Sequence, residues 1–148
     1  MNSVPQIRIL RANDKAVNAE GDFVLYWMIA FRRTTWNYSL QRAVDWAEDL
    51  GKPLVILEAV RCNYPWASDR LHRFVMDGML DNARQTCRHN VFYYPYVELK
   101  ADAGKGLLTA LAERACVIVT DDFPAFFIPQ MIKAASGNIS TARQRCAA

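Results

Sequence analysis

Residues that could bind a ligand follow four apolar segments of the chain, at the points where those segments end. They combine guanidinium, carboxylate, amide and aromatic groups. Such a mixture suits a planar heteroaromatic ligand, because rings stack on its faces while Arg and Asp bind its polar edge. The residues are 32–37 after the first segment, Arg61, Cys62 and Asn63 after the second (with Glu58 inside it), Glu98 and Lys100 after the third, and 120–123 after the fourth.

A simpler interpretation is that these charged groups satisfy one another. Arg33 would then pair with Asp121 or Asp122, and Asp122 would cap the helix that follows it. The sequence alone leaves both interpretations open.

Other chemistries find little support. No Gly-x-Gly-x-x-Gly motif follows the first apolar segment. The Ala-Gly-Lys-Gly stretch at 103–106 precedes a helical pattern and could cradle an anion, but an ordinary helix start explains it equally. His72 and His89 fall on or just after a helix, and no Gly-x-Ser-x-Gly occurs. The four cysteines form no Cys-x-x-Cys pair, so no catalytic residue and no metal site are predicted.

The apolar segments alternate with stretches of helical periodicity. Because the segments are apolar on both faces, they indicate strands of a parallel sheet covered by helices on each side. Pro95 removes a ladder donor and predicts an edge strand. We expect a three-layer α/β/α sandwich with a parallel, Rossmann-like sheet of about four to five strands, whose carboxyl ends gather the polar residues above. The expected strands are 23–31, 54–60, 91–99 and 116–120, and the expected helices are 36–50, 69–88, 107–115 and one that begins at Pro124 or Pro129.

The length of 148 residues suits one domain. We expect a flexible lead-in over 1–22, the α/β domain over 23–136 and an atypical tail over 137–148. The tail carries one large apolar residue, Ile139, and no strand signal. We expect either that the tail is an ordinary C-terminus or that the chain has been altered near Ser136 and has lost a strand.

Composition argues against two classes of protein. The formal net charge of +3 is too mild to indicate a nucleic-acid surface by itself. The residues before Gly21 include no apolar leader, and the longest apolar run, 23–31, is too short to span a bilayer. We therefore expect a cytoplasmic protein.

Several short motifs follow one another along the chain. They are Val-Leu-Tyr-Trp-Met at 24–28, Arg33-x-x-x-Asn37-x-x-Leu40, Pro-Leu-Val-Ile-Leu at 53–57, Arg70-x-x-x-Phe74-x-x-x-Gly78-Met-Leu, and Val-Ile-Val-Thr-Asp at 117–121 followed by Pro129. In this order and spacing they resemble the opening of the DNA photolyase and cryptochrome family. The Tyr-Trp-Met form of the first motif is most similar to class II cyclobutane pyrimidine dimer photolyases.

The resemblance implies an α/β domain that, in that family, precedes a helical domain holding FAD and the DNA lesion. An antenna chromophore (a deazaflavin, folate or flavin) passes light energy to reduced FAD, which donates an electron that splits the dimer. These 148 residues would supply at most the antenna half of a deoxyribodipyrimidine photolyase, with no FAD of their own. The residues implied to bind the antenna are Trp27, Met28, Arg33, Asn37, Asp121, Asp122 and Phe123.

The expected partners follow from the same resemblance. The expected partner is a helical flavin domain in another chain, or a second copy of this chain. DNA would be contacted only indirectly, and no membrane would be involved. The alternatives are a small Rossmann-like nucleotide- or flavin-binding module without photochemistry, and an interaction remnant that binds no ligand. Whether the chain is an enzyme is left open.

Overall fold

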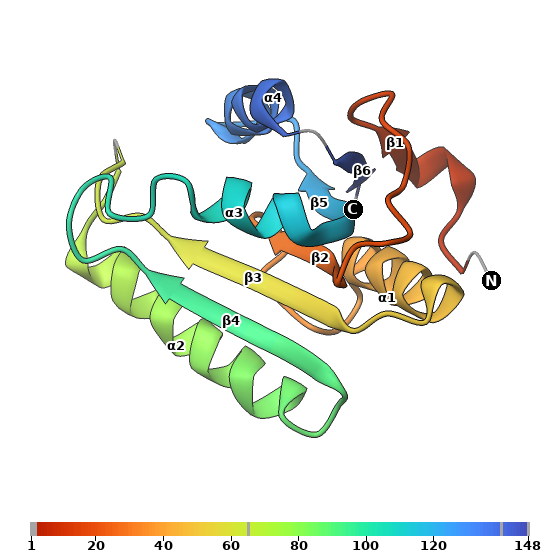
Figure 1. The fold of residues 1–148 in the computed structure, drawn as a ribbon. Helices are drawn as coiled ribbons and strands as arrows, with labels where there is room; N and C mark the ends of the chain where they lie inside the picture. The colour runs from red at the N-terminus through yellow and green to blue at the C-terminus, as the bar shows by residue number, and fades with distance from the viewer. Residues whose placement is uncertain (1–2, 65, 140, 148) are drawn as a thin grey trace.

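A six-stranded sheet with helices on both faces forms the fold in the computed structural model, which describes residues 3–64, 66–139 and 141–147 (Figure 1). The strand order is β1-β6-β5-β2-β3-β4. The strands are β1 (Ile9–Arg11), β2 (Phe23–Met28), β3 (Leu54–Val60), β4 (Val91–Val97), β5 (Ala115–Asp122) and β6 (Ala142–Ala147). The helices are the 3-10 turn η1 (Gln6–Arg8) and α1 (Tyr38–Leu50), α2 (Asp69–Thr86), α3 (Leu107–Arg114) and α4 (Ile128–Asn138).

The sheet has a Rossmann-like strand order, in which the direction of the connections changes at the central strands. Strands β2 to β6 are parallel, and β1 adds an antiparallel edge to β6. From β2 the chain moves through β3 to β4 and then crosses back to β5 and β6. Strand order therefore reverses between β2 and β5, and residues at their carboxyl ends lie where such sheets bind ligands. The predicted α/β class and mostly parallel sheet are confirmed, but the sheet has six strands where about four to five were expected, because β1 and β6 lie in the predicted lead-in and tail.

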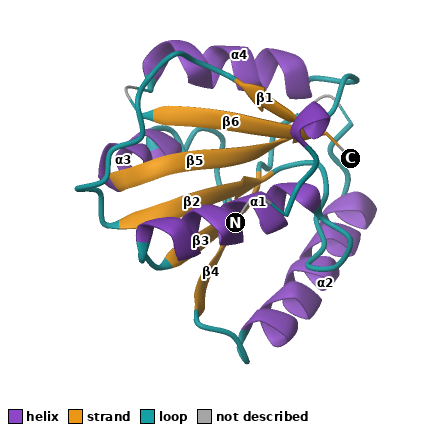
Figure 2. Cartoon of the chain, turned by 90° about the vertical axis from the view of Figure 1, so that its right-hand side faces the viewer, coloured by secondary structure: helices purple, strands orange, loops and turns teal. Residues whose placement is uncertain are grey.

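Two apolar layers hold the sandwich together. On one face, alternate residues of the central strands pack under α1, among them Val24, Ile56 and Val119. On the other face, Leu25 and Ile118 pack against α3 and α4. In Figure 2 the strands β6, β5, β2, β3 and β4 follow one another from top to bottom, and α1 lies in front of the middle ones. Because successive strand residues point to opposite faces, the two layers explain why β2, β3 and β5 are apolar without alternation.

The predicted tail contains a strand, which corrects the expectation that none follows Ser136. Strand β6 pairs with β5 on one side and β1 on the other, so ladder hydrogen bonds hold it from both sides. Its polar residues find partners in the surrounding layers. Gln144, for example, accepts hydrogen bonds at 3.0 Å from Arg42 Nε and Trp46 Nε1. Burial of polar side chains with partners leaves no apolar pattern in the sequence, so the pattern could not reveal this strand.

The expected lead-in includes the short strand β1 and several contacts with the rest of the chain. Val4 is buried, and the hydroxyl of Ser3 donates to Asp45 at 2.8 Å. Gly21 packs so closely that a Cβ there would lie 2.6 Å from the backbone nitrogen of Cys116. Residues 3–22 thus dock against α1 and β5. Of the positions discussed above, Met1, Asn2, Pro65, Ser140 and Ala148 lie outside the described residues.

The other predicted boundaries agree closely with the structure. Strand β2 ends at Met28, three residues before the predicted end of its apolar run, and β5 extends to Asp122. Pro95 lies in β4, which is an edge strand as predicted. No helix within the described residues is both long and apolar enough to cross a membrane.

Candidate functional site

The carboxylate of Asp121 lies at the switch in strand order and is fully enclosed. Oδ1 accepts the hydroxyl of Tyr26 at 2.7 Å. Oδ2 accepts the backbone N–H groups of Ile29, Ala30 and Phe31 at 2.8 to 3.0 Å. Four donors match the acceptor capacity of a carboxylate, about four lone-pair sites, so Asp121 is saturated. It fixes the turn after β2 and occupies the backbone N–H groups that would otherwise face a ligand.

Asn37 extends this cluster to helix α1. Its side-chain oxygen accepts the N–H of Leu40 at 2.9 Å and caps the helix. Its amide nitrogen lies 2.9 Å from the hydroxyl of Tyr26 and from the carbonyls of Phe31 and Arg33. We call Tyr26, Asn37 and Asp121 the Asp121 network; all three are buried.

Tyr26 is the member that sequence reasoning missed. Burial, and then the negative charge of Asp121, raises the pKa of its phenol well above the ordinary value. The phenol therefore remains a neutral donor at physiological pH. A tyrosine inside a strand that is apolar on both faces was the available signal, because its hydroxyl must find a partner in the core.

Aromatic side chains, some exposed and some half-buried, lie near the carboxyl edge of the sheet, towards which the arrowheads of β3 and β4 point in Figure 1. They come from the loops after β2, β3 and β5. Phe126 stacks on Phe123 with ring centroids 6.4 Å apart and meets Trp66 edge-on at 6.0 Å. Phe126 is 71% exposed and Trp66 60% exposed. We call this set the aromatic rim, and its members are Phe31, Tyr64, Trp66, Phe123, Phe126 and Phe127.

Backbone strain is found at the same edge. Trp36, Asp102 and Phe126 have positive φ values of 52°, 65° and 60° and lie in the loops after β2, β4 and β5. The left-handed conformation costs a non-glycine residue about 1–2 kcal/mol. Such strain concentrates at functional sites. Trp36 is also 93% exposed, so its ring does not stabilise the conformation by burial.

Two of the sequence-predicted site residues belong to the rim surface. Phe123 contacts Phe31 edge-on at 6.2 Å. Arg33 is exposed, with its guanidinium 5.9 Å from the Phe31 ring centre and its Nη2 3.2 Å from the carbonyl of Trp36. A guanidinium beside exposed rings offers both a stacking surface and a charged donor.

Asp122 faces away from this surface. It pairs with Arg145 of β6 at 3.3 Å. Helix α4 has Phe127 at its N-cap position. The expectation that Asp122 caps that helix, or that Arg33 pairs with one of the two aspartates, is therefore wrong: Arg33 bonds to a backbone carbonyl instead.

Trp27 and Met28 are buried on opposite faces of β2. The ring of Trp27 lies beneath the guanidinium of Arg143, 5.0 Å from its centre. The sulfur of Met28 lies 3.8 Å from the amide nitrogen of Asn82 in α2. The predicted site residues thus separate into a buried network, an exposed rim and two positions inside the layers.

Two further carboxylates near this edge are also occupied. Glu58 is buried and accepts bonds from Arg32 at 3.1 Å, Asn82 at 2.9 Å and Tyr93 at 2.6 Å. Glu98 accepts the backbone N–H of Cys62 at 3.1 Å and of Gly104 at 3.3 Å. The N–H of Gly104, in the glycine-containing stretch 103–106, therefore faces a carboxylate of the protein itself.

Metal-binding groups do not gather in this region. Across the described part of the chain, no three His, Cys, Asp or Glu side chains are placed to hold a metal ion. Cys62, Cys87, Cys116 and Cys146 are free thiols.

Known proteins similar to this chain include a curated sequence and a solved structure. No protein-family model matches the chain. A universal stress protein family structure from Burkholderia pseudomallei superposes with a TM-score of 0.47 and 17% identity, covering 82% of this chain and 95% of that one. A deoxyribodipyrimidine photo-lyase of Methanothermobacter thermautotrophicus is 31% identical over 114 residues, which are 77% of this chain. The chain spans 25% of the length of that photo-lyase, to which it is thus related over part of its sequence.

Proposed function

We propose that this chain is the light-harvesting α/β part of a photo-lyase-related protein, and that its aromatic rim binds a planar antenna chromophore. A deazaflavin, a folate or a flavin has the required shape. Bound there, the chromophore would supply absorption of near-UV and blue light. The Tyr-Trp-Met form of the first motif at 26–28 supports, as part of this proposal, a relation to the class II branch.

The observation that carries the proposal is the exposure of the rim at the switch in strand order. Four of its rings form a chain of contacts from Phe31 through Phe123 and Phe126 to Trp66, beside the pair Tyr64 and Phe127, and two of the six are more than half exposed. Soluble domains seldom leave such a surface uncovered without a binding role. Arg33 adds a cation that can meet a carbonyl or carboxylate at the edge of a ring system.

The Asp121 network argues against the main alternative, a nucleotide site in the same crevice. Nucleotide-binding Rossmann-like domains use free backbone N–H groups after the first strand to bind phosphate. Here those of residues 29–31 donate to Asp121, whose negative charge would repel a phosphate. The crevice therefore favours a ligand held by stacking.

Redox chemistry and lesion binding would be supplied by a separate helical flavin domain. DNA would then be contacted through that domain, and FAD would bind to it and not to this chain. Under this proposal the chain by itself splits no pyrimidine dimer.

Fluorescence titration tests chromophore binding. Riboflavin, a 5-deazaflavin and a methenyl folate are titrated separately with the purified chain, since stacking on rim aromatics quenches emission. We expect one of the three to bind. Phe123→Ala and Phe126→Ala should each weaken that binding roughly two- to tenfold, because an aromatic pair contributes about 0.5–1.5 kcal/mol.

Phe92→Ala is the matched control. Phe92 is 63% exposed, like the rim residues, but lies near the amino end of edge strand β4. Its replacement should leave the affinity unchanged. If none of the three chromophores binds, or if Phe92→Ala weakens binding as much as Phe126→Ala, the proposed antenna site is wrong.

The same exposed rim favours one second candidate, a surface that docks another protein chain without a chromophore. This candidate predicts self-association of the isolated chain through the rim. Light scattering would then show a dimer or larger species that Phe126→Ala and Trp66→Ala dissociate. A monomer at all concentrations, together with chromophore binding, would exclude it.

A further inference from the structure

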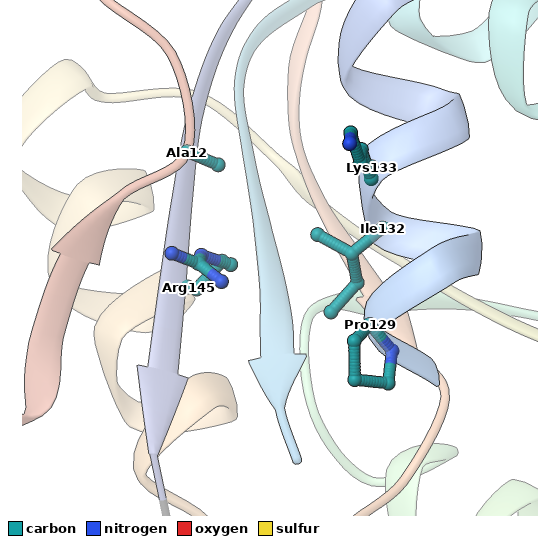
Figure 3. Close-up of a pocket in the computed structure, with 5 residues that line it drawn as sticks. All are labelled: Ala12, Pro129, Ile132, Lys133 and Arg145. Atoms are coloured by element: carbon teal, nitrogen blue, oxygen red, sulfur yellow. The ribbon is translucent and has the colours of Figure 1, made fainter. Parts of the chain in front are cut away.

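A groove lies between α1 and α2, on the face of the sheet opposite to α3 and α4. Helix α1 packs mostly on β2, β5 and β6, and α2 packs mostly on β4, so the two helices leave a space above β3. The groove has a volume of about 910 Å³, within the range of about 300–1,000 Å³ that is typical of sites for small molecules. The pocket between β6 and α4 in Figure 3 measures only about 220 Å³, and its Arg145 is already paired with Asp122.

Apolar side chains form the floor of the groove and much of its wall on α1. Leu54 and Ile56 of β3 lie at the floor and are almost fully buried. Leu40 and Val44 lie about one helical turn apart on α1, and both are half-buried, as is Val91 of β4. Most of the accessible apolar surface therefore belongs to the three half-buried residues. An apolar group that covers them leaves water, which favours its binding.

The opposite wall presents hydrogen-bond donors from the end of α2 and from the loop before β4. Arg84 is paired there with Asp81 at 3.1 Å. The side-chain oxygen of Gln85 accepts the hydroxyl of Thr34, which leaves its amide nitrogen as a donor. Arg88 is exposed, and no residue in the described part of the chain forms a hydrogen bond or an ion pair with its guanidinium. This wall thus includes a positive charge that no described carboxylate neutralises.

The wall on α1 carries a carboxylate, Glu48, about one helical turn after Val44. Like Arg88, Glu48 is exposed, and its side chain forms no hydrogen bond or ion pair with any residue that the structure describes. The two opposite charges line one groove from facing walls but lie too far apart to pair with each other. His89, next to Arg88, adds a ring nitrogen that can donate. The groove therefore has an acceptor on one side of an apolar floor and donors on the other.

We propose that this groove binds a small zwitterion with an apolar body, of the class of an apolar amino acid or dipeptide. Its carboxylate binds Arg88, its ammonium binds Glu48, and its apolar body covers Val44 and the surface around it. Each charge of such a ligand meets an opposite charge of the protein. A simple acid or a simple amine satisfies one wall and meets a like charge on the other. The groove includes no residue of the aromatic rim, so the proposal is independent of chromophore binding.

Titration with three matched ligands at pH 7, followed by ¹H–¹⁵N NMR of the wild-type chain, tests the proposal. L-leucine carries both charges, L-leucinamide lacks the carboxylate, and 4-methylpentanoate lacks the ammonium. We expect leucine to shift the amide resonances of residues that line the groove. It should bind roughly two- to tenfold more tightly than either analogue, because each analogue loses one charge-assisted contact. Leucine has no aromatic ring, so stacking on the rim does not contribute.

Two variants assign the two charges. Glu48→Gln should make 4-methylpentanoate bind as tightly as leucine, because the ammonium then has no anionic partner. Arg88→Gln should likewise make leucinamide bind as tightly as leucine. Both positions are exposed, so both variants should fold like the wild type. The matched controls are Glu113→Gln in α3 and Arg70→Gln in α2, which remove exposed charges outside the groove and should leave all three affinities unchanged.

L-leucyl-L-leucine distinguishes the two sources of this chemistry. Binding that is tighter than that of leucine identifies a dipeptide as the better ligand, and equal or weaker binding identifies a single amino acid. The proposal fails if neither compound shifts the amides of the groove, if either analogue binds the wild type as tightly as leucine, or if Glu113→Gln acts like Glu48→Gln. Because no chromophore is added, each of these results leaves the proposed function to its own test.

Discussion

The Asp121 network and the aromatic rim are neighbours at the same edge of the sheet, but they are opposite in character. In the network, Asp121 receives four hydrogen bonds and all three side chains are buried. In the rim, Phe126 and Trp66 are mostly exposed, and Phe126 has a strained backbone. The hydrogen-bonding groups of the network are already occupied and cannot bind a ligand. The rings of the rim are accessible and have few contacts that stabilise them.

This difference separates positioning from binding. The network joins β2, β5 and α1 and fixes the turn from which Phe31 and Arg33 project. The rim supplies the accessible rings. Substitutions in the network should therefore reduce stability, and substitutions in the rim should reduce ligand affinity with little change in stability.

Asp121→Ala should have the largest effect. It leaves three backbone N–H groups and the Tyr26 hydroxyl without their acceptor in a buried environment. Each unsatisfied buried group costs about 1–3 kcal/mol, so we expect a loss of about 4 kcal/mol or more in the free energy of unfolding. Urea denaturation followed by circular dichroism measures it. A loss below about 1 kcal/mol would show that the turn after β2 does not depend on this carboxylate.

Tyr26→Phe should have the next largest effect. It removes one hydroxyl that bonds both Asp121 and Asn37 while preserving the ring and its packing. We expect a loss of about 1–2 kcal/mol in the free energy of unfolding and unchanged chromophore affinity. Tyr94→Phe, on a half-buried tyrosine packed against the other layer, should change stability by less than about 0.5 kcal/mol. Equal losses in the two variants would contradict a specific role for the network.

The framework was predictable because its signals are local. Segments such as 54–60 are apolar on both faces, and Asn37 and Gly51 mark the ends of α1 as its N-cap and left-handed C-cap. These features follow from the local backbone and from burial away from solvent. They do not depend on which element packs against the segment. Strand β6 differs because its polar residues are held by other elements: the buried Arg143 donates to the carbonyl of Ile132 in α4, and the half-buried Gln144 accepts from Arg42 in α1, 102 residues away. Contacts with other elements, and not the strand preference of its own residues, make this segment a strand.

Sequence reasoning indicated where the candidate site would lie, but not which of its residues are accessible. The rule for parallel sheets pointed to the carboxyl edge, where the structure has Arg33, Phe123 and Asp121. It could not tell that Asp121 is enclosed by its own loop, because three backbone donors leave no trace in residue type. It also passed over Trp66 and Phe126, whose rings meet only when the loops after β3 and β5 fold together.

Glu98→Gln should have a smaller effect on stability than the two substitutions above. It tests, through the pH dependence of stability, a second carboxylate that accepts hydrogen bonds from the protein. Burial alone would raise the pKa of Glu98, but the N–H groups of Gly104 and Cys62 outweigh it and lower the pKa below the ordinary 4.5. A lowered folded pKa stabilises the protein above the unfolded pKa, and this stabilisation is lost as pH falls through the folded value. The wild type should therefore lose stability below about pH 4.5 more steeply than Glu98→Gln, in urea midpoints measured from pH 7 to 3. Parallel curves would contradict the lowered pKa.

The smallest effect on stability is expected at Phe126, where strain and ligand affinity can be separated. Phe126→Gly and Phe126→Ala both remove the ring, but only glycine relieves the left-handed backbone at φ 60°. Glycine should therefore be the more stable of the two by up to about 1 kcal/mol, and close to the wild type. Both should weaken chromophore binding equally, because both lose the same stacking surface. If alanine proves as stable as glycine, the loop relaxes and the strain is not maintained by the rim; if the two differ in affinity, backbone conformation and not the ring determines binding.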